Sequence, residues 1–102
     1  MKKYLIAITT ILSLSALSNV AVAGDIAAGK AKSMVCAACH GMAGISATDM
    51  WPNLAGQKKG YLEKQIKAFR DGTRTDPSMS PMVKGLSDAD AANLAAYFNS
   101  LK

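Results

Sequence analysis

Five positions near the start of the chain hold every strong soft-metal ligand that the chain contains. The stretch C-A-A-C-H at 36–40 includes both cysteines and the only histidine among 102 residues. In a helix, Cys36, Cys39 and His40 stand at positions i, i+3 and i+4 and therefore share one face. Few chemistries use two thiols and one imidazole at that spacing, so this motif constrains the fold more than any other feature of the sequence.

Three familiar interpretations explain only part of the motif. A dithiol–disulfide switch is expected beside a βαβ pattern, and this sequence carries no good strand signal. Structural zinc needs four ligands, usually in two separated pairs, so a carboxylate would have to complete the set. A structural disulfide is possible in an exported protein, but it leaves the adjacent histidine without a role.

Covalent attachment of haem uses all three side chains. The thiols of Cys36 and Cys39 can add to the two vinyl groups along one edge of a porphyrin, and His40 then directs its imidazole to the iron. One covalently bound haem c would also complete the core of a domain of this size, because small domains bury little apolar surface by themselves. The sequence therefore predicts a haem c site at 36–40.

The first 23 residues have the pattern of a cleaved signal peptide. Lys2 and Lys3 give a positive start, a mostly apolar run follows at 4–17, and A-V-A at 21–23 offers a cleavage site. The apolar run is shorter than the roughly 20 residues that a membrane-spanning helix needs. We expect cleavage after Ala23, export to the periplasm, and no stable membrane insertion of the remaining chain.

Residues 24–102 are then expected to form one domain. Removal of Lys2 and Lys3 leaves ten basic against 7 acidic residues, so the formal charge falls from +5 to +3. That excess is too small to indicate a nucleic-acid-binding protein.

Helical signals recur three times along this domain, and the expected fold class is all-α. The predicted helices run over about 25–39, 60–71 and 87–101. Asp25 can cap the first, Gly72 can close the second, and Ser87 with Asp90 forms an approximate capping box for the third. Apolar residues expected to face inward are Ile26, Met34 and Val35 in the first helix, Leu62, Ile66 and Phe69 in the second, and Ala91, Leu94, Tyr97, Phe98 and Leu101 in the third. Two long loops, at 41–57 and 71–86, hold most of the glycines and prolines.

The chain resembles a single-domain class I cytochrome c. It is similar to the short bacterial carriers and to one half of the dihaem cytochromes c built from two such domains. The resemblance covers essentially all of 24–102 and rests on C-A-A-C-H, W-P-N-L-A-G-Q at 51–57, S-M-S-P-M at 78–82 and L-S-D-A-D…L-A-A-Y-F at 86–98. It implies a small fold of three main helices and two long loops around one covalent haem.

A methionine is expected on the second face of the iron, because the chain has no second histidine. Met34, Met42 and Met50 belong to segments expected on the side of His40, whereas Met79 and Met82 lie in a later loop able to cross the opposite face. Met79 is held between Pro77 and Pro81, which stiffen the loop. The resemblance also implies a ligand about eight residues before the serine that caps the last helix, which is the spacing from Met79 to Ser87. We expect Met79 as the axial ligand, with Met82 as the alternative.

The resemblance further implies a tight crossing of the first and last helices, with Gly29 against Leu94 or Tyr97. It also implies that a backbone carbonyl of the following loop, often that of a proline, orients the histidine ligand. Here Asp49 occupies the corresponding position and Pro52 comes three residues later, so both are candidates. Trp51 is expected either to reach a haem propionate or to pack beside the ring.

With both axial positions of the iron filled, the haem can pass electrons but cannot bind a substrate. We therefore expect a soluble periplasmic electron carrier and not an enzyme, with redox proteins of the membrane or periplasm as transient partners. Alternatives are a haem c subunit dedicated to one oxidase or reductase, or a haem enzyme or gas sensor with an open iron site. The basic residues around Tyr61 could form a docking face for an acidic partner or only a solvated surface.

Overall fold

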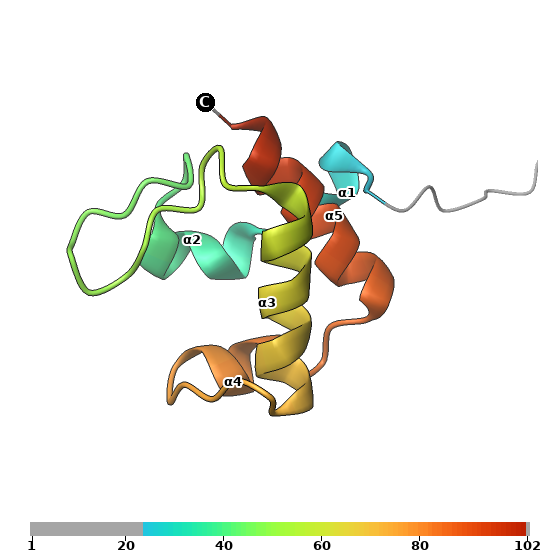
Figure 1. Cartoon of the computed structure of the whole chain (residues 1–102). Coiled ribbons are helices and arrows are strands. Elements are labelled where there is room, and N and C mark those ends of the chain that lie inside the picture. The colour runs from blue at the N-terminus through green and yellow to red at the C-terminus, as the bar shows by residue number, and fades with distance from the viewer. Residues whose placement is uncertain (1–23, 102) are drawn as a thin grey trace, which may run out of the picture.

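The computed structural model describes residues 24–101, so the predicted signal peptide and its cleavage point lie outside the described residues. Its helices are α1 (Ile26–Lys32), α2 (Met34–His40), α3 (Lys59–Asp71), α4 (Met79–Val83) and α5 (Asp88–Ser100). None of residues 24–101 lies in a strand, which confirms the predicted all-α class (Figure 1). Within the same range, no helix combines the length and the apolar character needed to cross a membrane.

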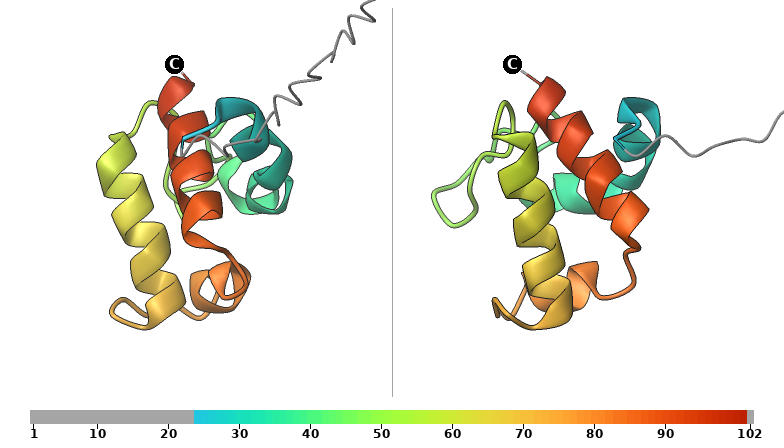
Figure 2. Two further views of the ribbon diagram at one scale, coloured as in Figure 1. Left: turned by 90° about the vertical axis from the view of Figure 1, so that its right-hand side faces the viewer. Right: turned by 45° about the vertical axis from the view of Figure 1, so that its right-hand side comes forward.

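Helix α5 is the element against which α1 and α3 pack (Figure 2). It starts with the predicted capping box: the hydroxyl of Ser87 accepts the N–H of Asp90 at 3.0 Å, and the carboxylate of Asp90 accepts the N–H of Ser87 at 3.0 Å. The core formed with α3 is small, and its buried members are Leu62, Leu94, Ala95, Tyr97 and Phe98.

The crossing of α1 and α5 occurs at Gly29. A Cβ atom at this position would lie 2.0 Å from the carbonyl oxygen of Asn93 and 2.8 Å from the Cβ of Tyr97. The side-chain oxygen of Asn93 also accepts the N–H groups of Gly24 and Asp25, at 3.1 and 2.9 Å. The predicted crossing is therefore confirmed, with Tyr97 among its contacts, and only glycine allows the two backbones to come so close.

The single helix predicted over 25–39 is wrong, because the chain breaks it at Ser33. The hydroxyl of Ser33 donates to the carbonyl of Lys30 at 2.7 Å, and its N–H is shared between the carbonyls of Gly29 and Lys30 at 2.9 and 3.2 Å. A serine side chain that bonds to a carbonyl of the preceding turn competes with the helical ladder. A second helix, α2, then begins at Met34.

The break changes which side chains of this region face inward. Ile26, Met34 and Val35, predicted to face the core, are 51%, 58% and 56% exposed. The inward face of α2 carries Cys36 and His40 instead, which are one helical turn apart. The prediction that these three residues face inward assumed one continuous helix over 25–39.

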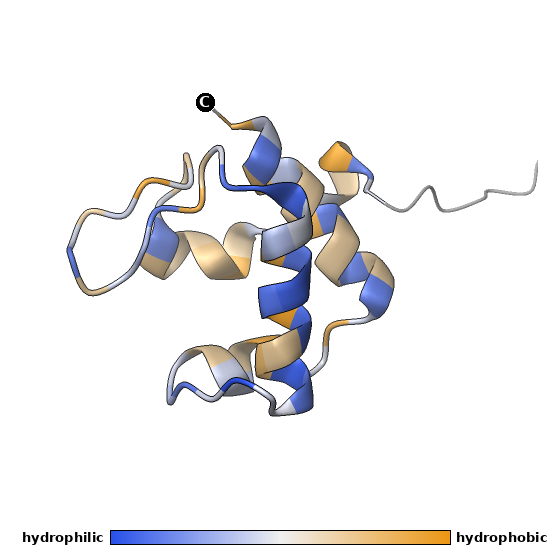
Figure 3. Ribbon diagram, in the orientation of Figure 1, coloured by the Kyte–Doolittle hydropathy of each residue, from blue (hydrophilic) through white to orange (hydrophobic). Residues whose placement is uncertain are grey.

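The two later helices follow their predicted ranges closely, and the segment between them is more ordered than expected. Gly72 ends α3, and the predicted loop at 71–86 contains the short helix α4. Helix α4 packs near the C-terminal end of α3, whereas α2 contacts α1, which precedes it (Figures 1 and 2). Both α2 and α4 are dominated by apolar residues, whereas α3 carries many hydrophilic ones (Figure 3).

Candidate metal centre

The imidazole of His40 is held in one orientation. The ring is buried, with 4% of the residue exposed, and its Nδ1 lies 2.8 Å from the carbonyl oxygen of Pro52. Gly41, at φ 85°, turns the chain directly after the histidine and starts the loop that returns with Pro52. Of the two candidates that the sequence left open, the structure therefore selects Pro52 over Asp49 as the residue that orients the ring.

The other ring nitrogen of His40 is unusual. Among the described residues, Nε2 is the one buried side-chain nitrogen or oxygen without a hydrogen-bond partner. Leaving such a group unpaired costs about 1–3 kcal/mol, so it calls for an explanation. Because a proton on Nδ1 satisfies the Pro52 carbonyl, Nε2 keeps a free lone pair, which is the state of a histidine that binds a metal.

The two cysteines are half-buried and unbridged. Burial, and secondarily the nearby Cys39, raises the pKa of the Cys36 thiol. Cys36 is therefore a neutral thiol at neutral pH. Across residues 24–101, no three or more His, Cys, Asp or Glu side chains converge as a metal cluster. No carboxylate thus joins the motif as the fourth ligand that the zinc interpretation needs.

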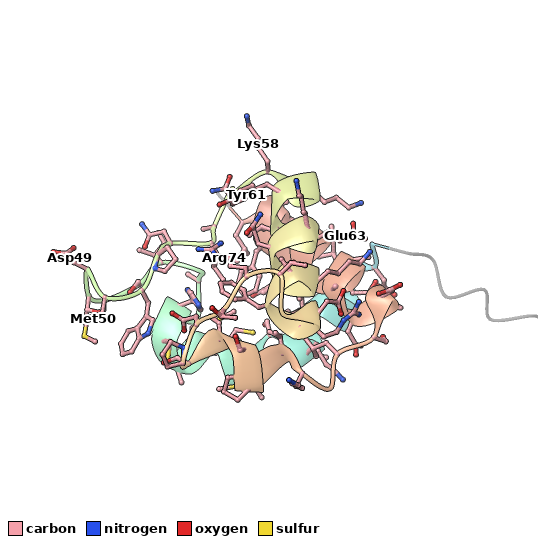
Figure 4. The ribbon with its side chains drawn as sticks, turned by 60° about the horizontal axis from the view of Figure 1, so that its bottom comes forward. Asp49, Met50, Lys58, Tyr61, Glu63 and Arg74 are labelled. Carbon is pink, nitrogen blue, oxygen red and sulfur yellow. The ribbon has the colours of Figure 1, made fainter. Side chains whose placement is uncertain are left out.

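The methionines differ in how far their side chains are exposed to solvent. Met34, Met42, Met50 and Met82 are 58%, 68%, 78% and 49% exposed, whereas Met79 is half-buried at the start of α4. Met50 lies beside Asp49 at the outer tip of the loop, and its side chain points away from the helices (Figure 4). Of the methionines in the described part of the chain, Met79 alone is not exposed.

The loop that carries Pro52 is closed on itself and tied to α5. The carbonyl of Gly44 accepts the N–H groups of Leu54 and Ala55 at 2.7 and 2.9 Å, and the N–H of Gly56 donates to the carbonyl of Phe98 at 2.9 Å. These bonds hold the Pro52 carbonyl near His40. No sequence pattern pointed to this closure, because backbone groups in an irregular loop supply most of it. Trp51, between Pro52 and the loop tip, is half-buried, and both of its predicted roles stay predictions.

A small helical domain with a buried imidazole that keeps one lone pair free, and with two thiols on the preceding turn, has the design of a c-type haem protein. The comparison with known families agrees. The sequence matches the Cytochrome c family over residues 26–102, and the chain belongs to that family. The protein accordingly carries covalently bound haem c, and the spacing of Cys36, Cys39 and His40 fits one such group.

Several relatives are similar over the whole domain. The chain is 46% identical over 102 residues to cytochrome c4 of Pseudomonas aeruginosa, covering 100% of this chain and 50% of that protein. It is 51% identical over 81 residues to cytochrome c-554(548) of Halomonas halodenitrificans, covering 76% of this chain and 98% of the relative. The crystal structure of reduced cytochrome c4 from Pseudomonas stutzeri superimposes with a TM-score of 0.75 and 42% identity, over 78% of this chain and 47% of that one. The chain thus spans about half the length of the cytochrome c4 relatives, which confirms the predicted likeness to one half of a two-domain protein.

Proposed function

We propose that this protein is a soluble periplasmic electron carrier that shuttles single electrons through one haem c ligated by His40 and Met79. The observation that carries the proposal is the unpaired Nε2 of His40. A buried imidazole whose Nδ1 is committed to a carbonyl is fixed in the tautomer and orientation that an iron ligand requires. The bound haem supplies a reversible one-electron iron couple.

Cys36 and Cys39 form the covalent link. The link would form by addition of each S–H across one vinyl group, with a carbon–sulfur bond formed, the π bond broken and the thiol proton placed on the neighbouring carbon. Because this addition is redox-neutral, it would need both cysteines reduced, as they are in the structure. Cys36 also packs against the buried cluster that includes Leu94, so the link would join the haem directly to the hydrophobic core.

Met79 is the proposed second axial ligand because it is half-buried and lies close to His40, on a different helix. Its thioether is a soft, neutral donor that favours ferrous iron and raises the reduction potential relative to a second imidazole. Met82, one turn later in α4 and 49% exposed, remains the alternative ligand.

The open-site alternatives are tested by adding carbon monoxide to the reduced protein. We expect little or slow binding at neutral pH, because a ligand held within the chain must dissociate first, and only the fraction of molecules with an open iron can bind the gas. The absorption spectrum before and after addition is the measurement. Rapid, complete binding would identify an open iron and favour a haem enzyme or a gas sensor.

The leader-like sequence at 1–23 supports export and removal of that segment, with the domain at 24–102 acting in the periplasm. A relative named as the thiosulfate dehydrogenase electron acceptor of Thiomonas intermedia is 43% identical over 68 residues, covering 66% of this chain and 31% of that protein. That relationship supports oxidoreductases as transient partners of this carrier. A haem c subunit dedicated to one oxidase or reductase remains the alternative, and in neither case is the protein itself an enzyme.

The basic start of α3 is the proposed docking face for an acidic redox partner. Both cations in the later part of α3 are paired. Lys67 pairs with Glu63 at 2.9 Å, and Arg70 pairs with Asp88 at 2.7 Å. No ion pair involves Lys58, Lys59 or Lys64 among residues 24–101. Lys58 and the half-exposed Tyr61 project outward at this end of α3 (Figure 4). Unpaired cations of this kind accelerate encounter with a negatively charged partner.

Reversing one of these charges should slow electron exchange with an anionic reagent. We expect Lys58→Glu to lower the bimolecular rate with hexacyanoferrate by at least about threefold at low salt, and the difference to shrink as salt shortens the Debye length from about 30 to 3 Å. Stopped-flow absorbance measures the rate. Lys30→Glu on α1 changes the net charge equally and is the matched control. Equal slowing by both variants would mean that only net charge matters, and that α3 is no docking face.

A further inference from the structure

The segment that carries Met79 is anchored to α3 where it leaves that helix. The guanidinium of Arg74 lies 4.5 Å from the centre of the Phe69 ring and donates to the side-chain oxygen of Gln65 at 2.8 Å. The N–H of Arg74 donates to the carbonyl of Ala68 at 3.1 Å. The path of the chain is therefore fixed two residues before Asp76.

The carboxylate of Asp76 then holds the backbone of Met79 directly. One of its oxygens accepts the N–H groups of Ser78 and Met79, both at 2.8 Å. In return, the N–H of Asp76 donates to the hydroxyl of Ser80 at 3.0 Å, and the N–H of Ser80 donates to the carbonyl of Asp76 at 3.0 Å. Four hydrogen bonds thus join one residue to the three that follow Pro77.

This arrangement works as an N-terminal cap for the turn that leads into α4. A carboxylate in this place satisfies N–H groups that have no helical partner, and Pro77, which has no N–H, fits the first position of the turn. The N–H groups of Met79 and Ser78 lower the pKa of Asp76 below its usual range. The two bonds at 2.8 Å fix the backbone at Ser78 and Met79 by their geometry.

We propose that Asp76 is the positioning residue for the axial methionine, fixing the backbone of Met79 so that its thioether is presented to the iron. The proposal rests on the proposed ligation by His40 and Met79. A thioether bound through a flexible side chain has little geometric preference of its own. When the backbone of Met79 is already ordered, less conformational entropy is lost as the thioether binds the iron. The fraction of molecules with an open iron site then stays small.

The test compares Asp76→Ala with Asp76→Asn in the haem-loaded protein. We expect carbon monoxide to bind ferrous Asp76→Ala on the order of tenfold faster than the native protein, because loss of a cap shifts its local equilibrium by about that factor. The methionine–iron charge-transfer band of the ferric protein should weaken in parallel. Asparagine retains an acceptor oxygen at the same distance, so Asp76→Asn should stay within about twofold of native. Asp49→Ala, at the tip of the other loop, is the control and should change neither readout.

A double variant separates positioning from general loosening of the fold. In a Met79→Ala background, Asp76→Ala should have no further effect on carbon monoxide binding, because the ligand that it positions is gone. An additional increase there would overturn the proposal, as would a native-like rate in Asp76→Ala itself. If Asp76→Ala does not fold, Asp76→Glu takes its place, because it keeps the charge but displaces the carboxylate. Carbon monoxide should then bind Asp76→Glu faster than the native protein, and a native-like rate would overturn the proposal. Rapid binding to the native protein would instead refute the ligation by Met79 and, with it, this role of Asp76.

Discussion

Replacement of Met79 by alanine is expected to open the iron to external ligands. If the thioether occupies the site for all but about 1% of the time, an external ligand binds the native protein about a hundredfold more weakly than it binds an open iron. Met79→Ala should therefore raise the apparent affinity for carbon monoxide by about that factor or more. Its reduction potential should also fall, because the thioether favours ferrous iron. Carbon monoxide titration and potentiometry of the purified haem protein measure both effects.

Met82→Ala is the matched control, since it removes a thioether from the same short helix. Met82 is 49% exposed, so its loss should leave the iron closed and cost less than about 1 kcal/mol of unfolding free energy. The cap formed by Asp76 uses the backbone of Met79 and survives in both variants. The reverse outcome, with Met82→Ala open and Met79→Ala closed, would assign the ligand to Met82.

The sequence predicted those features that depend on local spacing. Cys36, Cys39 and His40 share a helical face because their positions differ by three and four, and the capping box at Ser87 needs only the identities of two residues three apart. In both cases, the physical cause lies within one or two turns of helix. The crossing at Gly29, in contrast, was predicted through the resemblance to a known family, because a glycine inside a helical pattern can also be merely tolerated.

The features that the sequence did not predict depend on where single polar groups point. The break at Ser33 follows from a hydroxyl that bonds to Lys30, although serine also occurs within many unbroken helices. The choice of Pro52 over Asp49 depends on how the loop at 41–57 closes through backbone bonds. The cap at Asp76 was missed because the segment had been expected to be a loop, although D-P-S at 76–78 is itself a signal for the start of a helix.

Gly29→Ala should be among the most destabilising single substitutions in the domain. The added Cβ would lie 2.0 Å from a backbone oxygen of Asn93, and no side-chain rotation relieves a contact with backbone. Overpacking usually lowers the free energy of unfolding by 1–3 kcal/mol, and we expect this contact with backbone to cost about 3 kcal/mol or more. For a domain of this size that corresponds to a fall in Tm of roughly 15 °C. Thermal and denaturant unfolding of the haem-loaded protein measure the loss.

Gly60→Ala, in the first turn of α3, is the matched control. Nothing lies within 4 Å of a Cβ at that position, so alanine should be neutral or stabilise the protein by up to about 1 kcal/mol through its better helix propensity. The iron should remain closed to carbon monoxide in folded Gly29→Ala, because α1 contains neither His40 nor Met79. If Gly29→Ala lowers the free energy of unfolding by less than about 1 kcal/mol, α1 and α5 can separate at low cost. The close approach of their backbones would then not be what holds the N-terminal part of the domain in place.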